Sequence, residues 1–307
     1  MSDVDLQLLT TFVRVYEARN VTRAAEDLGL SQPTVSHALA RLRRQVGDEL
    51  FVRAPGGVRP TDHADALYRD AAPALATLRG AVEHARGFDP ATARRLFRIC
   101  LTDLGETAIL PAVLTEITRR APNVEIEVVP MNVDRAASWL QTGEIDLAVA
   151  TMDLGPSLRT EVLFADGYVL AMRRGHPLAE GALTTRDFEA ARHAVVTDVA
   201  GHRMPVEAMA ALGIERRIAL RVPNFATIPP ALARTDLVAV VPWGAVRMRP
   251  VHGDLVSRPL PFEVRPVDVR LWRRPGTGSP AVRWLRSTIV EASARPDDWA
   301  YPHPATT

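Results

Sequence analysis

The spacing of Ala25, Gly29 and Val35 constrains the fold of this chain more than any other feature of its sequence. Two helices that cross steeply around a tight turn need a small residue at their contact, a glycine in the turn and a branched apolar residue on the second helix. The other apolar positions are filled by Ala24, Leu28, Leu30 and Ala38. The pattern predicts a helix-turn-helix; a pair of core helices in another kind of bundle is the alternative.

Capping and turn residues support this motif. The spacing of Leu6, Leu9, Phe12, Val13 and Tyr16 predicts a preceding amphipathic helix. Thr22 is the expected N-cap of the first helix of the motif, which stops at Gly29. Ser31 is the expected N-cap of the second helix, with Pro33 in its first turn and an end near Gly47.

A β-hairpin is predicted after the motif, where two short apolar runs flank Pro55-Gly56-Gly57. Arg53 and Arg59 lie on its two arms. Beside a helix-turn-helix such a hairpin is typical of a wing whose arginines meet phosphates or the minor groove. A surface hairpin with solvated arginines is the alternative.

Residues 62–86 predict one long helix with a heptad seam, because apolar residues recur at alternating steps of four and three. The seam consists of Leu67, Ala71, Ala74, Leu78, Ala81 and Ala85. A seam of this kind needs a partner helix, so we expect dimerisation here. Pro73 removes one backbone hydrogen bond and predicts a local kink.

From Leu96 onward, strand-like runs alternate with helical ones, which is typical of βαβ units and largely parallel sheets. The expected strands are Leu96–Leu101, Val124–Val129, Ile145–Ala150, Glu161–Met172, Ala194–Val196, Ile218–Val222, Leu237–Val241 and Val267–Trp272. Helices are expected near Glu106–Arg120, Val133–Gln141 and Pro280–Ala294, before a polar tail over Arg295–Thr307. Ligands of such sheets bind at the carboxyl ends of the strands.

Composition excludes several classes of protein. All 37 basic residues are arginine, so no P-loop or Schiff-base lysine exists. The net charge of +1 requires any DNA binding to come from a local surface. No apolar run is long enough to span a bilayer, and the N-terminus lacks the pattern of a secretory signal. With Cys100 as the only cysteine, a cytoplasmic protein is expected.

The order of these parts resembles the LysR-type transcriptional regulators over nearly the whole chain. The most specific stretch is Val21–Val52, VTRAAEDLGLSQPTVSHALARLRRQVGDELFV, which is similar to the family's signature segment. The stretches FDPATARRLFRI, Thr102–Glu106, Arg174–Leu178 and Val222–Phe225 resemble the subgroup of nodulation and salicylate-responsive regulators.

The resemblance implies a winged helix-turn-helix over residues 1–61, a dimerisation helix and hinge over 62–94, and an α/β effector domain over 95–300. That domain would have two Rossmann-like lobes, similar to periplasmic solute-binding proteins: lobe I at about 95–164 and 267–300, and lobe II at about 165–266. The chain would cross between the lobes twice. The family commonly forms a dimer of dimers and binds a small organic inducer between the lobes, here with an aromatic acid as the candidate. RNA polymerase is a further candidate partner.

The resemblance maps base-edge contacts onto Gln32, Pro33, Ser36 and His37. An amide suits adenine, a hydroxyl bonds either way, and proline offers an apolar face to thymine. His37 is a weaker guanine reader than the arginine of many relatives. Phosphate contact is expected at the start of the preceding helix. The remaining DNA-contact candidates are Thr22, Arg23, Ser31, Thr34 and Arg41, while Arg43 and Arg44 suit a solvated face or an ion pair with Asp48 or Glu49.

Polar residues at the predicted strand ends are the candidates for the effector site. They are Thr102, Asp103, Asn132, Thr151 and Thr197. His202 matches a residue near the inducer in salicylate-type relatives, or is a plain loop histidine. Phe225 and Trp272 either wall the cleft or belong to the core. Asp103 and Asp166 disfavour a bare carboxylate ligand unless an arginine compensates, and Arg203 is the nearest in sequence.

No catalytic or metal-binding constellation is recognised in the sequence, so no enzyme is expected. The leading hypothesis is an effector-responsive transcriptional regulator. A solute-binding protein, or an enzyme fused to a DNA-binding domain, is the alternative.

Overall fold

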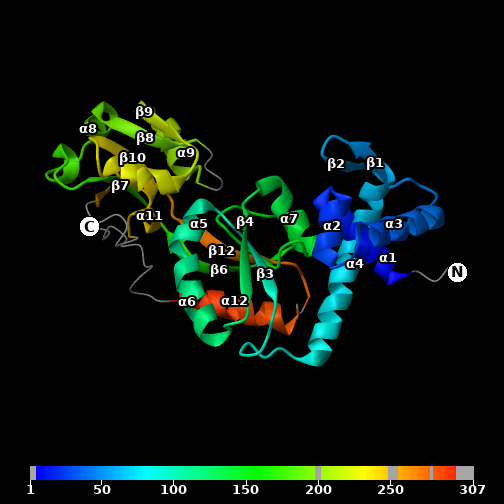
Figure 1. Ribbon diagram of the computed structural model, residues 1–307. Helices are drawn as coiled ribbons and strands as arrows, with labels where there is room; N and C mark the ends of the chain where they lie inside the picture. The colour runs from blue at the N-terminus through cyan, green and yellow to red at the C-terminus, as the bar shows by residue number, and fades with distance from the viewer. Residues whose placement is uncertain (1–4, 198–201, 248–254, 277–278, 295–307) are drawn as a thin grey trace. The chain divides into compact units, whose positions relative to one another are not determined.

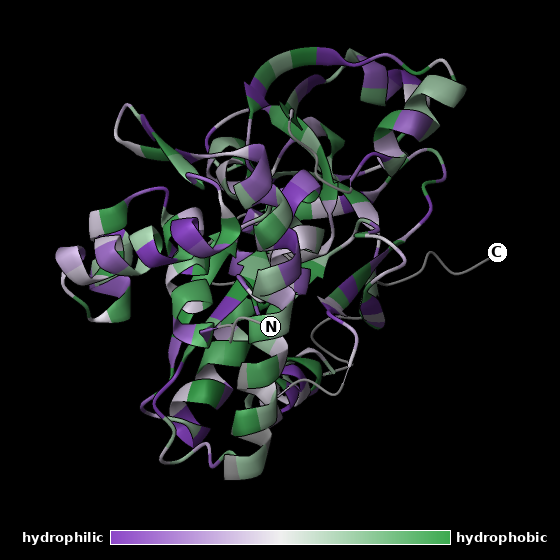
Figure 2. Ribbon diagram, turned by 90° about the vertical axis from the view of Figure 1, so that its right-hand side faces the viewer, coloured by the Kyte–Doolittle hydropathy of each residue, from purple (hydrophilic) through white to green (hydrophobic). Residues whose placement is uncertain are grey.

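The computed structural model describes residues 5–197, 202–247, 255–276 and 279–294. The chain forms two compact units, one that runs to Gly87 and a second that begins at Phe88 (Figure 1). Helices of both carry hydrophilic and hydrophobic bands side by side, as expected where one helix face covers a core (Figure 2). The predicted polar tail lies outside the described residues.

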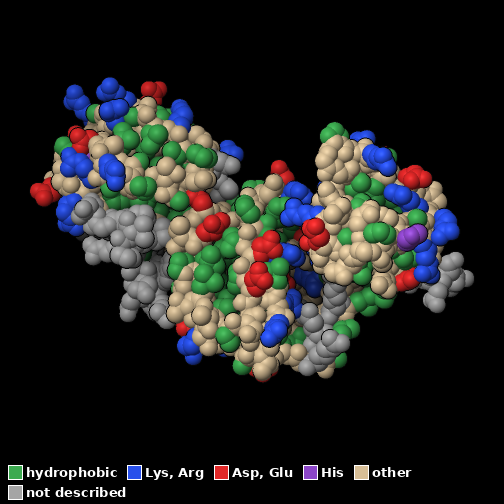
Figure 3. Space-filling view, in the orientation of Figure 1, with side chains coloured by type: hydrophobic (Ala, Val, Ile, Leu, Met, Phe, Trp, Pro, Cys, Tyr) green, Lys and Arg blue, Asp and Glu red, His purple; other side chains and the backbone are tan. Residues whose placement is uncertain are grey.

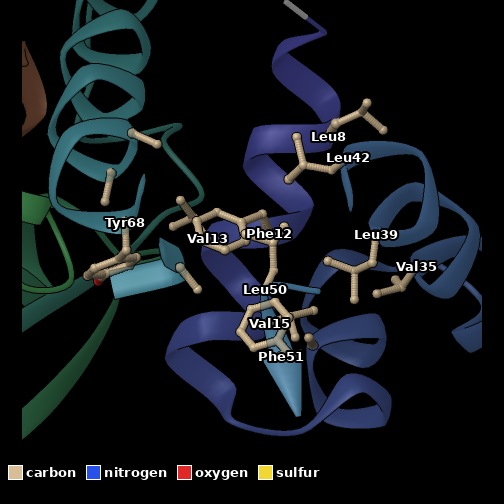
Figure 4. Packing of buried hydrophobic residues seen from close by; sticks show 14 of the residues in the cluster. Leu8, Phe12, Val13, Val15, Val35, Leu39, Leu42, Leu50, Phe51 and Tyr68 are labelled. Atoms are coloured by element: carbon tan, nitrogen blue, oxygen red, sulfur yellow. The ribbon is translucent and has the colours of Figure 1, made fainter. Parts of the chain in front are cut away.

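The first unit is a helix-turn-helix with a two-stranded wing and one long helix, as predicted. Its elements are α1 (Leu6–Ala18), α2 (Val21–Leu28), α3 (Gln32–Val46), β1 (Phe51–Ala54), β2 (Gly57–Pro60) and α4 (Asp62–Arg86). Their apolar side chains form one core in which Phe12, Val15, Val35 and Leu50 are fully buried (Figure 4). This core fixes α2, α3 and the wing against α1.

The start of α2 differs from the prediction. Asn20, and not Thr22, is the N-cap: its Oδ1 accepts hydrogen bonds from the N–H groups of Thr22 and Arg23, at 2.9 and 3.1 Å. Asparagine caps helices at least as well as threonine, which explains the shift of the start. The predicted cap of α3 is confirmed, because the Ser31 hydroxyl accepts from the Thr34 N–H at 3.3 Å.

The second unit contains two five-stranded sheets. Sheet I has the order β4-β3-β5-β12-β6, with β3 (Leu96–Leu101), β4 (Glu125–Pro130), β5 (Leu147–Ala150), β6 (Arg159–Asp166) and β12 (Val267–Arg273). Sheet II has the order β11-β7-β10-β8-β9, with β7 (Tyr168–Arg173), β8 (Arg192–Val196), β9 (Arg217–Val222), β10 (Leu237–Pro242) and β11 (Leu255–Pro259). We call the two sheets with their helices lobe I and lobe II.

Helices connect the strands within each lobe. Lobe I contains α5 (Asp103–Ala108), α6 (Leu110–Arg120), α7 (Val133–Thr142) and α12 (Pro280–Ser293). Lobe II contains η1 (Pro177–Ala179), α8 (Thr185–Ala190), α9 (Met204–Ala211), η2 (Phe225–Thr227), α10 (Ile228–Leu232) and α11 (Gly244–Arg247). The single helix predicted over Glu106–Arg120 is two helices that meet at Ile109, where Pro111 opens the first turn of α6.

The expectation of largely parallel sheets is wrong. Strand β12 runs antiparallel to β5 and β6, and β7 runs antiparallel to β10 and β11. Parallel pairing joins β3 to β4 and β5, and β8 to β9 and β10. Strands β7 and β12 enter their sheets directly from the other lobe, without the crossover helix that a parallel neighbour requires.

The chain crosses between the lobes twice, as the family resemblance implied. The single strand expected over Glu161–Met172 is two strands in different sheets, β6 and β7, with Gly167 between them. The second crossing joins Pro259 to Val267, so β12 and α12 return to lobe I. Strand β11, which the sequence did not predict, precedes this crossing.

Candidate DNA-reading helix and effector cavity

The turn between α2 and α3 has the geometry that the residue spacing requires. Gly29 adopts the left-handed conformation with φ of 64°, and its N–H caps the end of α2. Ala25 and Val35, 2% and 0% exposed, lie in the core that the two helices share. A side chain larger than that of Ala25 would push the helices apart.

The first turn of α3 presents its polar side chains outward. Gln32, Pro33, Thr34 and His37 are exposed, and Ser36 is half-buried. The Gln32 side-chain amide donates to the Ser36 Oγ at 3.0 Å, so these two residues, one turn apart, form a single polar surface. An adenine edge can replace this internal hydrogen bond.

The other DNA-contact candidates are exposed but partly engaged. The backbone N–H groups of Thr22 and Arg23 donate to Asn20 and are therefore not free to bind phosphate. Phosphate contact at this helix start would have to come from the side chains of these two residues. Arg41 pairs with Asp5 at 3.1 Å. The Ser31 and Thr34 hydroxyls bond each other at 2.8 Å.

Arg43 and Arg44 lie in the last turn of α3. The Arg43 Nε–H donates a hydrogen bond to the backbone carbonyl oxygen of Glu49 at 2.6 Å. Its guanidinium also lies 3.7 Å from the Glu49 carboxylate. This agrees with the expected ion pair. Arginine side chains gather along the α3 side of the first unit (Figure 3).

The wing is anchored at the end of α1. The Val58 N–H donates to the Arg19 carbonyl at 2.8 Å, and a Cβ on Gly57 would lie 2.1 Å from the same oxygen. Arg53 pairs with Val58 across the hairpin and Val52 with Arg59, so the two exposed arginines point to opposite faces. One hairpin face therefore offers one arginine, not both.

The predicted seam of α4 divides into two parts. Ala71 is 7% exposed in the core of the first unit, and the half-buried Leu67 packs against that core. In the single chain Ala71 is therefore covered and Leu67 is partly covered, while their assignment to a dimerisation seam stays a prediction. Further along, Ala74, Ala81 and Ala85 are exposed, as are Leu78 at 47% and Val82 at 53%.

A cavity lies between the lobes of the second unit, at the carboxyl ends of β3 and β5. Its volume is about 30 Å³, room for about two water molecules. Four of the predicted effector residues line it: Thr102, Thr151, Asp166 and His202. The rest of its described wall is Leu104, Gly105, Ala108, Ile109, Val149, Ala150, Phe164, Gly244 and Val269.

Asp166 supplies a buried carboxyl group at the first crossing between the lobes. It is 6% exposed, and both of its oxygens lie 3.3 Å from the Gly244 N–H, which donates to it. Burial raises the pKa of Asp166 to about 6, because a carboxylate loses its hydration there. A Cβ on Gly244 would lie 3.0 Å from Oδ2, so this glycine permits the close approach.

His202 enters the cavity from lobe II. It is 6% exposed, and its Nδ1 lies 2.9 Å from the Tyr168 hydroxyl. The Phe225 ring packs edge-on against the imidazole with ring centres 5.2 Å apart. Burial lowers the pKa of His202 to about 4, so the ring is neutral at pH 7.

Five predicted effector residues do not line this cavity. Asn132 is exposed and caps α7, and the Thr197 hydroxyl donates to the Val222 carbonyl oxygen. Trp272 is 4% exposed in the core that contains Cys100 and Ala136, so it is a core residue, the alternative that its sequence position left open.

The other two stand beside the cavity. Asp103 Oδ2 accepts from the Ala226 N–H at 3.0 Å, which joins α5 of lobe I to η2 of lobe II. Phe225 supports His202 from the lobe II core. Asp103 therefore contributes to the contact between the lobes, and Phe225 contributes to the packing of lobe II.

Sequence reasoning missed Tyr168, Gly244 and the apolar wall. Gly244 follows the carboxyl end of β10, so the strand-end rule applied to that strand points to it. Ile109, Val149 and Val269 look like ordinary core residues in the sequence, and nothing there separates a cavity wall from a core.

Neither a metal centre nor a membrane span was found in the part of the chain that the structure describes. No group of three His, Cys, Asp or Glu side chains there can hold a metal ion. Among the same residues, no helix is both long and apolar enough to cross a bilayer.

Comparison with known proteins agrees with both halves of the fold. Residues 6–65 match the family model described as bacterial regulatory helix-turn-helix protein, lysR family, and residues 90–294 match the model of the LysR substrate binding domain. The fold and these two matches together define a DNA-binding transcriptional regulator with an effector-binding domain. The chain belongs to the LysR family.

Individual relatives are similar along nearly the full chain. The HTH-type transcriptional activator NagR of Ralstonia sp is 35% identical, over 95% of this chain and 98% of its own. NahR of Pseudomonas putida, also an HTH-type transcriptional activator, is 38% identical over 79% and 81%. A probable transcriptional regulator from Pseudomonas aeruginosa has a crystal structure that superposes with a TM-score of 0.68 at 32% identity, covering 93% of this chain and 96% of that one.

Proposed function

We propose that the protein reads its operator with the first turn of α3 and that an effector bound between the lobes controls the outcome. Gln32, Pro33, Ser36 and His37 contact base edges in this proposal. The exposure of Gln32, Pro33 and His37 on a capped helix, with the half-buried Ser36 bonded to Gln32, supports it. The residues proposed to contact the DNA backbone are Thr22, Arg23, Ser31, Thr34, Arg41, Arg53 and Arg59.

The effector site is the cavity that Thr102, Thr151, Asp166 and His202 line. The observation that carries this proposal is that its wall comes from both lobes, with Gly244 and His202 opposite lobe I. The cavity holds about two waters, so an organic ligand enters only if α5 and α11 separate. Ligand binding is thereby tied to the arrangement of the lobes, which is what a switch requires.

The effector is a small organic molecule. An aromatic acid is the candidate that the sequence suggested. The carboxyl group of Asp166 in the cavity wall disfavours a ligand that carries a carboxylate. No other cofactor enters the proposal.

We place the protein in the cytoplasm, as a homodimer that assembles into a dimer of dimers and acts with RNA polymerase. The exposed apolar residues in the second half of α4, Leu78 and Val82 among them, support an interface between two copies.

Selection of DNA from a random-sequence pool by the full-length protein tests the proposed DNA-reading function. We expect one consensus with two related half-sites, and loss of that consensus in Gln32→Ala. A selection that returns no consensus would contradict specific reading by α3. Thr34→Ala, which removes a hydroxyl proposed to face the backbone, serves as the matched control and should return the wild-type consensus.

A further inference from the structure

Among the described residues of the cavity wall between the lobes, one side chain is acidic, that of Asp166. This carboxyl group is 6% exposed and receives the Gly244 N–H. A second carboxylate placed in the cavity would face it at short range in a medium of low polarity, where like charges repel strongly.

No cation compensates for this group among the described residues of the wall. His202 is buried, bonds Tyr168 and is neutral at pH 7, because burial lowers its pKa to about 4. Arg203, the nearest arginine in sequence, has a side chain 77% exposed that lies 3.5 Å from the Glu207 carboxylate. The described wall therefore lacks the arginine that a bare carboxylate ligand would need beside Asp166.

Two hydroxyl groups complete the polar surface of the cavity. The Thr151 Oγ1 is buried and has no hydrogen-bond partner, which leaves a donor and an acceptor unsatisfied. The Thr102 Oγ1 accepts from the Gly105 N–H at 3.2 Å, so its own proton remains available to an acceptor. The Thr151 hydroxyl and the Asp166 carboxyl line the same cavity and are both open to a polar group of a ligand.

The remaining wall is apolar and includes one aromatic ring, that of Phe164, beside Leu104, Ile109, Val149 and Val269. Such a surface favours a hydrocarbon body. We propose, on the basis of the effector site argued above, that the cavity takes an uncharged, largely apolar molecule whose hydroxyl or amide group donates a hydrogen bond to Asp166, and that it rejects carboxylates.

Matched probe compounds that differ only in one substituent test this ligand class. The panel consists of benzyl alcohol, benzamide and benzoate, and of the corresponding 2-naphthyl alcohol, amide and carboxylate. Binding to the full-length protein at pH 7.5 is followed by the melting temperature and by calorimetry. We expect the alcohols and amides to stabilise the protein and to bind at least about tenfold more tightly than the matched carboxylates.

Three variants test whether this preference for uncharged probes arises in the cavity. Asp166→Asn removes the charge at nearly constant shape and should narrow the gap between carboxylate and neutral probes at least about tenfold. Glu125→Gln removes the same charge from the exposed edge strand β4 and should leave the gap unchanged. Thr151→Val keeps the volume and should weaken the neutral probes by about tenfold.

The outcomes separate the two proposals. Carboxylates that bind wild-type protein as tightly as the neutral probes would overturn the ligand class and leave the effector site standing. An unchanged difference in affinity between neutral and carboxylate probes in Asp166→Asn would also overturn the ligand class and leave the effector site standing. If no member of the panel stabilises the wild-type protein, the cavity is not an effector site, and both proposals fail.

Discussion

At the scale of single residues, the proposed DNA reading rests most on Gln32 and Ser36, which form one hydrogen-bonded pair on the exposed turn of α3. Replacing Gln32 by Ala removes the amide that suits adenine, so we expect specific binding to weaken by about 1–3 kcal/mol while non-specific binding is retained. Titration of selected and scrambled duplexes by fluorescence anisotropy measures both. Equal losses on the two duplexes would mean that Gln32 contacts the backbone.

Two buried histidines predict how stability depends on pH. Burial lowers the pKa of His193 and of His202 to about 4, whereas an unfolded histidine titrates near 6.5. The unfolded chain therefore binds these protons first, and stability is lost as the pH falls from 6.5 toward 4. Asp166 acts in the opposite direction, since its pKa is raised to about 6, and acidification below that value favours the folded state.

The histidines outweigh the aspartate, so we expect the free energy of unfolding to fall between pH 7 and pH 5, by about 2 kcal/mol for each histidine. His193→Gln keeps a donor for the Phe188 carbonyl oxygen, which the imidazole meets at 2.7 Å, and should make this fall shallower. Urea unfolding at several pH values measures it, with the exposed His37→Gln as the control. An equally steep fall in His193→Gln would show that folding does not lower the pKa of His193.

At the scale of elements, the docking of the wing onto α1 depends on a missing side chain. A Cβ at Gly57 would lie 2.1 Å from the Arg19 carbonyl oxygen, so Gly57→Ala must move the hairpin. We expect a loss of stability of about 1–3 kcal/mol and weaker DNA binding, because Arg53 and Arg59 move with it. Thermal unfolding with Pro55→Ala in the exposed turn as control checks this, and a variant as stable as that control would contradict the docking.

The apolar residues of α4 fall into a buried group and an exposed group, and this difference allows a test of which of them mediate dimerisation. Leu78 and Val82 are exposed in the single chain, whereas Leu75 is 6% exposed in its own core. Leu78→Asp with Val82→Asp should yield folded monomers by sedimentation, and Leu75→Asp should instead impair folding of the first unit. Dimers of normal mass in the double variant would place the interface elsewhere.

The same seam shows where sequence reasoning reaches its limit. Heptad spacing indicates that one face of α4 is apolar, but it does not say whether the chain's own helices or a partner cover that face, and Leu67 and Ala71 turned out to be covered by the chain itself. Local signals predicted the helix-turn-helix, the wing and most strands well. They merged β6 with β7 and missed β11, and they did not predict that β12 runs antiparallel to its neighbours, because sheet membership and direction depend on crossings between lobes that leave no periodic pattern.

The sequence predicted some of the residues that line the cavity and not others. Thr102 and Thr151 follow strands whose carboxyl ends meet at one edge of a sheet, so local reading placed them together correctly. Asn132 and Thr197 also follow strands but are used in a helix cap and a backbone hydrogen bond. Which strand ends face the other lobe is decided by the path of the chain, and only the structure contains that information.

At the scale of the whole molecule, the lobes are held by contacts that a ligand would have to disturb. Asp103 accepts from the Ala226 N–H, and Leu104 packs into the core of lobe II. A ligand shifts this arrangement only by the difference in its affinity for the two states. Asp103→Asn weakens one such contact, so we expect the effector to act at a lower dose in this variant, as measured by promoter activity. If a higher dose were required, the ligand would prefer the arrangement of the lobes in which Asp103 bonds the Ala226 N–H.

Replacing Thr151 tests most directly whether an effector in the cavity switches regulation. Its hydroxyl has no partner, whereas that of Thr102 also caps α5, so Thr151→Val deletes a ligand contact at little cost to folding. The measurement is promoter activity against dose of the probe compound that stabilises the protein most, with operator affinity of the ligand-free protein in parallel. We predict a dose curve shifted at least about tenfold in Thr151→Val with unchanged operator affinity. Superimposable curves for variant and wild type would mean that the effector does not act from this cavity.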